Sequence, residues 1–139
     1  MKKNEPNSEI KKNIEELHWE IQDFKSNLQF INDEIAFMNN MLDSYIFEPD
    51  TPNLFERLQE YKAHLKKCTE KKQEVQNQIS KHENNLGGLL ERNEIPLDPI
   101  DFLKHEKLKN SIKNYMNDYQ KLKTEFYNYT GGILKKHKP

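Results

Sequence analysis

Residues 10–45 of this chain read IKKNIEELHWEIQDFKSNLQFINDEIAFMNNMLDSY. Apolar side chains recur along this stretch at steps that alternate between four and three residues, without an error from Ile10 to Tyr45. A heptad rhythm kept over about five repeats is typical of a helix that buries one narrow seam against neighbouring helices. The rhythm predicts a coiled-coil helix over about residues 8–47.

Two further stretches repeat the same rhythm. The series from Leu54 to Leu89 predicts a second helix over about residues 53–92. Only Lys72 and His82 are out of character for its seam.

The third series starts at His105, is richer in tyrosine, and predicts a helix over about residues 99–130. Gly131 and Gly132 fit a helix C-cap, which leaves residues 131–139 as a basic tail that we expect to be frayed.

The breaks between the series contain turn and capping residues. The first break spans residues 48–53, where Asn53 and Glu56 have the spacing of a capping box. The second spans residues 93–99 and ends with Asp98 as a predicted N-cap before a first-turn proline. Connections this short force consecutive helices to lie antiparallel.

The sequence therefore predicts an all-α fold, an elongated antiparallel three-helix coiled-coil bundle in which residues 1–139 form a single domain. At 1.5 Å rise per residue, helices of about 40 residues form a rod of roughly 60 Å. The plan resembles a spectrin-type repeat in helix number, helix length and antiparallel order. The tryptophan that such repeats bury in their first helix has no counterpart here, since Trp19 lies off the seam.

Composition and the absence of known motifs argue against several classes of function. The net charge of -1 gives no overall attraction to nucleic acid or to an anionic membrane. The sequence shows no secretory leader and no run of roughly 18 apolar residues, and its lone Cys68 suits a reducing compartment, so we expect a cytoplasmic protein. It shows no glycine-rich phosphate loop and no catalytic motif, so we expect neither enzymatic activity nor a cofactor.

A second apolar stripe follows the back of the first helix. At 100° per residue, Trp19, Phe30, Phe37 and Met41 fall within about 40° of one another, away from the seam. Large apolar side chains aligned on an outward face are typical of a partner-binding surface. We expect this stripe to bind a protein partner or a second copy of the chain, and a homodimer through paired first helices is the simplest form.

Charge is divided unevenly along the chain. Residues 8–48 hold nine acidic and three basic residues, a net charge of about -6, and the later helices and the tail compensate. This division favours packing of the first helix between two more basic neighbours, and between molecules it can set the choice of partner.

Two other readings remain open. Antiparallel folding brings His18, His82 and His105 to one end of the rod, where histidines with nearby carboxylates suggest a metal or small-ligand site, or a polar layer that responds to pH. A ribosome- or nucleic-acid-associated rod would use the basic tail and a set of lysines on the second helix, although glutamates are mixed among them: Lys62, Lys66, Lys67, Lys71 and Lys72.

Overall fold

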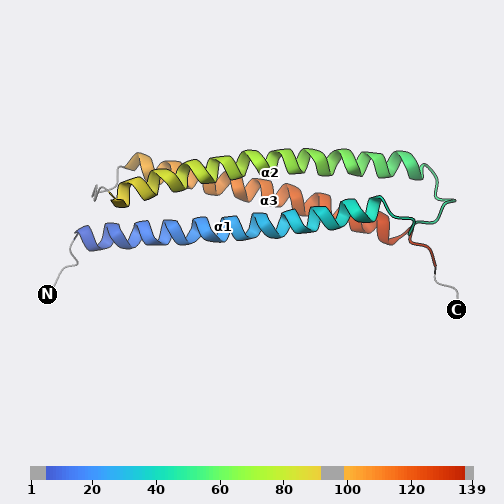
Figure 1. Ribbon diagram of the computed structural model, residues 1–139, viewed down its shortest axis with the longest axis horizontal. Coiled ribbons are helices and arrows are strands. Elements are labelled where there is room, and N and C mark those ends of the chain that lie inside the picture. Colours follow the sequence, from blue (N-terminus) through green and yellow to red (C-terminus); the bar gives the residue numbers. More distant parts are fainter. Residues whose placement is uncertain (1–5, 92–98, 137–139) are drawn as a thin grey trace.

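The computed structural model consists of three long helices that lie side by side (Figure 1). They are α1 (Pro6–Leu42), α2 (Leu54–Glu91) and α3 (Pro99–Gly131). The structure describes residues 6–91 and 99–136, and side chains within 15–88 and 99–136. The predicted all-α antiparallel three-helix bundle is confirmed.

The heptad seams form the core of the bundle. Most described seam positions of the three helices are buried, and Lys72 and His82 are buried among them as the rhythm requires. The seam positions Ile10, Ile14 and Leu89 lie outside the described side chains. The best-buried apolar seam residues are Ile21, Leu28, Met38, Leu65, Ile79, Ile112, Tyr119 and Phe126.

The first helix ends earlier than predicted. α1 stops at Leu42, and Tyr45, which was expected on the seam, is 90% exposed. The chain turns at Ser44, whose N–H and hydroxyl both donate to the Met41 carbonyl, at 3.2 and 2.6 Å. Phe47 then becomes buried at the end of the rod. The helix ends because the segment finds other backbone partners, which a heptad count does not register.

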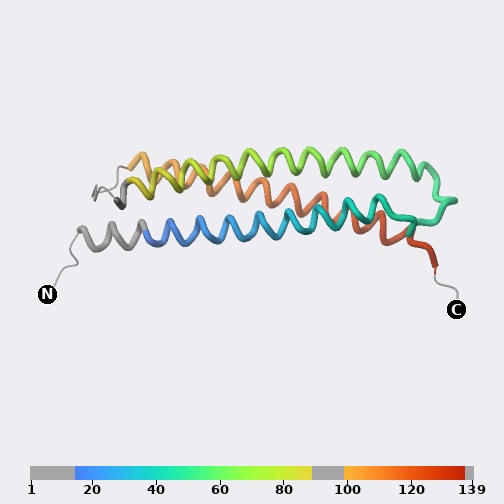
Figure 2. Tube along the Cα trace, in the orientation of Figure 1, coloured from blue at the N-terminus to red at the C-terminus, as the bar shows by residue number. Residues whose placement is uncertain are grey.

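Those partners come from the predicted tail. The Glu48 N–H donates to the Ile133 carbonyl at 2.8 Å, and the Lys135 N–H donates to the Ile46 carbonyl at 2.7 Å. Figure 2 shows the chain after α3 passing beside the α1–α2 connection. The expectation of a frayed tail was wrong for residues 133–135, because these hydrogen bonds fix them; residues 137–139 lie outside the described part.

The helix ends differ in detail from the predicted caps. Asn53 precedes α2 with φ of 56°, a left-handed conformation that asparagine tolerates, and its carbonyl accepts the Arg57 N–H at 2.9 Å. At the end of α3, neither Gly131 nor Gly132 has positive φ. The Gly132 N–H instead donates to the Tyr129 carbonyl at 3.2 Å, a 3₁₀-type closure. The predicted turn at 93–98, with Asp98, lies outside the described residues.

Tyrosines dock α3 through their hydroxyl groups as well as their rings. The buried Tyr115 hydroxyl donates to the Cys68 carbonyl at 3.1 Å, and the buried Tyr119 hydroxyl donates to Glu34 Oε1 at 2.8 Å. Burial raises the pKa of both phenols, so both stay neutral donors. A buried hydroxyl that lost its acceptor would cost about 1–3 kcal/mol, so these bonds fix the level of α3 against its neighbours.

An aromatic cluster packs the last turns of α3 against the first turns of α2. The ring of Phe126, 0% exposed, meets the ring of Tyr61 edge-on at a centroid distance of 5.6 Å. The Tyr129 ring also contacts Tyr61, at a centroid distance of 5.6 Å and a tilt of 31°, and the Arg57 guanidinium lies 4.7 Å from the Tyr129 ring centre. Such aromatic pairs contribute about 0.5–1.5 kcal/mol beyond the area they bury.

Candidate functional site

Three aromatic side chains of the predicted stripe stand exposed on α1. The exposed fractions are 77% for Trp19, 61% for Phe30 and 58% for Phe37. They share a face because steps of 7 and 11 residues return to nearly the same angle on a helix. Met41 differs: it is partly buried and packs against the core, so the surface as the structure places it consists of the other three. We call these three residues the aromatic stripe.

α2 and α3 pack against two flanks of α1, and the aromatic stripe lies on the outward face of α1 between these flanks. On one flank, Gln22 and Lys25 bind Glu83 of α2 at 2.8 and 3.0 Å. The Lys25 ammonium lowers the pKa of the Glu83 carboxyl group. The partners on the other flank belong to α3, so neither α2 nor α3 lies against the outward face of α1.

Two carboxylates of α1 hold α3 on that second flank. Glu34 pairs with Lys123 at 2.5 Å and also accepts the Tyr119 hydroxyl, while Glu20 pairs with Lys109 at 3.1 Å. The acidic first helix thus neutralises basic residues of its neighbour, as the uneven charge predicts.

Carboxylates also border the aromatic stripe on the solvent side. Glu15 and Asp33 lie at about -40° from Trp19 around the helix, and Glu16 and Asp23 lie at about +40 to +60°. All four are exposed. Within residues 15–41 the only lysine or arginine is Lys25, which faces α2. The exposed outward half of α1 is therefore apolar along its centre and acidic along both borders.

Two of the three candidate histidines form a buried pair. The distance from His82 Nε2 on α2 to His105 Nδ1 on α3 is 2.9 Å, and both residues are buried. Glu20 Oε2 of α1 lies 3.7 Å from His105 Nε2. A proton on that nitrogen faces the carboxylate favourably, which leaves His105 Nδ1 to accept a hydrogen bond from the His82 Nε2–H. The pair therefore links all three helices.

Burial sets the protonation state of this histidine pair. Desolvation lowers the pKa of His82, and the neighbouring His105 lowers it further. Desolvation also lowers the pKa of His105, and Glu20 opposes that change only in part. Two imidazolium rings in this contact would repel each other and leave no acceptor nitrogen between them. The pair forms a buried polar layer, and the response of this layer to pH stays a prediction.

The predicted convergence of three histidines is seen for two of them, His82 and His105. His18 is exposed on α1 and lies near Glu83 of α2. Across the described residues, no group of three or more histidine, cysteine, aspartate or glutamate side chains is placed to hold a metal ion. A helix level deduced from chain numbering gives height along the rod but not the direction of a side chain around its helix, and that direction decides which histidines meet.

A sequence model of the syntaxin-like protein family matches residues 20–138, a range that takes in most of α1 and all of α2 and α3. This chain belongs to the syntaxin-like protein family. Comparisons with curated proteins and with solved structures give no match. Membership agrees with the all-α three-helix fold and suggests a role in protein interaction. The matched range of this syntaxin-like chain contains Phe30 and Phe37 and starts one residue after Trp19.

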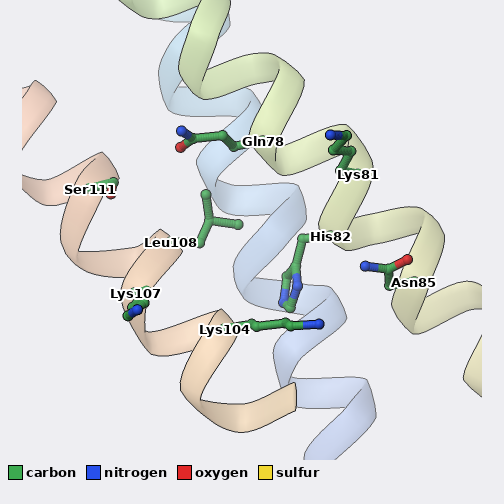
Figure 3. Close-up of a pocket in the computed structure, with 8 residues that line it drawn as sticks. All are labelled: Gln78, Lys81, His82, Asn85, Lys104, Lys107, Leu108 and Ser111. Carbon is green, nitrogen blue, oxygen red and sulfur yellow. The ribbon is translucent and has the colours of Figure 1, made fainter. Parts of the chain in front are cut away.

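The structure adds a groove that sequence reasoning missed. A groove of about 420 Å³ opens between α2 and α3 of the syntaxin-like chain, with Leu108 and the buried His82 among the residues that line it. Figure 3 shows His82 from α2 and Lys104 from α3 extending towards each other across it. The sequence feature that could have indicated this groove is the set of short or polar side chains next to the two seams, where large apolar side chains would have filled the space. These residues are Gln78, Asn85 and Ser111.

The lysines proposed for nucleic-acid binding are not equivalent in the structure. Lys72 is buried and donates to Asn32 of α1, and Lys62 forms an ion pair with Asp43. Both serve the contact between α1 and α2 in this syntaxin-like chain. Three of the predicted set remain exposed on α2: Lys66, Lys67 and Lys71. Within residues 6–91 and 99–136, no helix has the long apolar run that crossing a bilayer requires.

Proposed function

We propose that this syntaxin-like chain is a non-enzymatic interaction or scaffold protein that holds a protein partner through the outer face of α1. The observation that carries the proposal is the exposure of Trp19, Phe30 and Phe37 in one line on a helix whose opposite face is fully used by the core. Free Cys68 agrees with a cytoplasmic place of action, which is part of the proposal.

The size of the aromatic stripe supports this use. A buried aromatic side chain covers about 150–250 Å², so the exposed parts of these three sum to roughly 400 Å². At about 25 cal/mol/Å², covering them yields about 10 kcal/mol before the cost of association, which is itself about 4–15 kcal/mol. The stripe is therefore a strong anchor, and the residues along its borders decide whether and with what it forms a stable complex.

The first experiment measures association directly. A photo-crosslinking amino acid replaces Ser26, which is exposed between Trp19 and Phe30 on the same face, and crosslinked products are isolated from cells and sized. We expect one defined adduct whose yield falls at least ten-fold when Trp19→Ala, Phe30→Ala and Phe37→Ala are combined. Light scattering on the purified chain over a range of concentrations shows whether the chain associates with itself. A chain that stays monomeric means that the adduct contains a different protein.

A matched variant controls for loss of exposed apolar area in general. Tyr45, Phe55 and Leu103 have similar exposed fractions, at 90%, 71% and 63%, and lie away from the stripe. Their combined replacement by alanine is expected to leave the adduct unchanged, and helicity is expected to be normal in both triple variants. An adduct that survives the stripe variant, or that both variants lose equally, would contradict the proposal.

A further inference from the structure

The borders of the aromatic stripe indicate which kind of partner covers it. The stripe runs from Trp19 to Phe37, about 27 Å along the helix, so a helix of about five turns matches its length. Its borders hold exposed carboxylates on both sides, Glu15 and Asp33 on one and Glu16 with Asp23 on the other. A partner must place groups beside these carboxylates whatever its orientation.

A second copy of α1 brings the wrong charge to those positions. In a parallel two-fold pair, the two borders of one copy face the opposite borders of the other, so Glu15 lies beside Glu16 of the second copy. In an antiparallel pair that sets Trp19 against Phe37 of the second copy, Asp23 lies level with Glu34 of the second copy, which Lys123 already neutralises, so Asp23 gains no free basic partner there. The parallel arrangement presses free carboxylates together, which suppresses that pairing, and the antiparallel arrangement leaves the border carboxylates without a basic partner.

The basic residues that α1 and α3 place beside the described part of the stripe do not correct the mismatch. Lys25 is the only basic residue of α1 between positions 15 and 41, and it is held by Glu83 on the flank that faces α2. Lys109 and Lys123 of α3 are held by carboxylates of α1 on the other flank. No basic side chain from either of these pairs is available to the outward face.

We propose that the aromatic stripe is covered by a basic amphipathic helix of another protein, whose apolar face is bordered on both sides by lysine or arginine. This inference rests on the proposed function and names the partner's chemistry. Apolar contact along the centre anchors the helix, and charge pairing along the borders selects it. Such a complex weakens as salt rises, because the border charges remain at the solvent-exposed rim.

Trp19 is the single tryptophan of the chain, so its fluorescence reports directly on covering of the stripe. The probes are two tryptophan-free helical peptides of about 21 residues with the same leucine face, one bordered by lysine and the other by glutamate. We expect the lysine peptide to shift Trp19 emission to shorter wavelength, with a Kd at least ten-fold lower than that of the glutamate peptide. Its Kd is expected to rise several-fold between low and high salt.

Replacing carboxylates by carboxamides distinguishes attraction of the lysine peptide to the borders of the stripe from its attraction to acidic residues elsewhere on the chain. Asp23→Asn with Asp33→Asn is expected to weaken the lysine peptide at least three-fold, while Glu56→Gln with Glu70→Gln, both exposed on α2, leaves its Kd unchanged. Equal affinity for the two peptides, equal loss in both variants, or a peptide-free dimer that already covers Trp19 would overturn the inference.

Failure of this inference can be told apart from failure of the proposed function. If the crosslink at Ser26 forms and depends on Phe30 and Phe37 while the lysine peptide gains no advantage, the stripe binds a partner of other chemistry. If that crosslink does not depend on the stripe, the proposed function fails as well.

Discussion

Removal of the Phe126 ring tests whether α3 is docked as firmly as the core geometry implies. The side chain is fully buried and meets Tyr61 edge-on at 5.6 Å. A buried Phe→Ala change costs about 3–5 kcal/mol, of which the edge-on aromatic contact accounts for about 0.5–1.5 kcal/mol. Since domains of this kind are stable by about 5–15 kcal/mol, Phe126→Ala is expected to remove a large share of the free energy of unfolding.

Urea unfolding followed by circular dichroism measures this cost. The matched control is Phe55→Ala, the same change at a ring that is 71% exposed, which is expected to alter the free energy of unfolding by less than about 0.5 kcal/mol. A loss below about 1 kcal/mol for Phe126→Ala, with an unchanged urea dependence, would refute the reasoning. It would mean that the last turns of α3 contribute little to the cooperative bundle.

Two further changes test the polar contacts of α3. Burial lowers the pKa of His82 and His105 below the ordinary value of 6.5, so on acidification the unfolded chain takes up protons before the folded chain does. The contribution of these histidines to the stability of the fold is therefore complete above about pH 6.5 and is lost as the pH falls below it. Replacing both histidines by leucine should flatten that fall in unfolding experiments; an equally steep fall would count against the histidine pair. Tyr119→Phe removes the hydroxyl that donates to Glu34 and should cost about 1–3 kcal/mol by urea unfolding, whereas Tyr45→Phe at an exposed ring should cost nothing measurable.

The heptad rhythm determined the three helices and most of their buried faces, and the short connections between its series determined their antiparallel order. It could do so because a helical period is a local property, set by neighbours three and four residues apart. The same period placed Trp19, Phe30 and Phe37 opposite the seam, where the structure leaves them exposed. Even the polar seam positions Lys72 and His82 are buried as the period requires.

Only the tertiary structure decided which residues contact each other on the flanks of the helices and at the end of the rod. The pairing of Phe47 with Leu134 joins segments far apart in sequence, and it ends α1 several residues before the rhythm would. The contact of His82 with His105 depends on how α2 and α3 are rotated towards each other. These contacts depend on long-range approach and rotation about the helix axis, which a count of apolar residues along the chain does not contain.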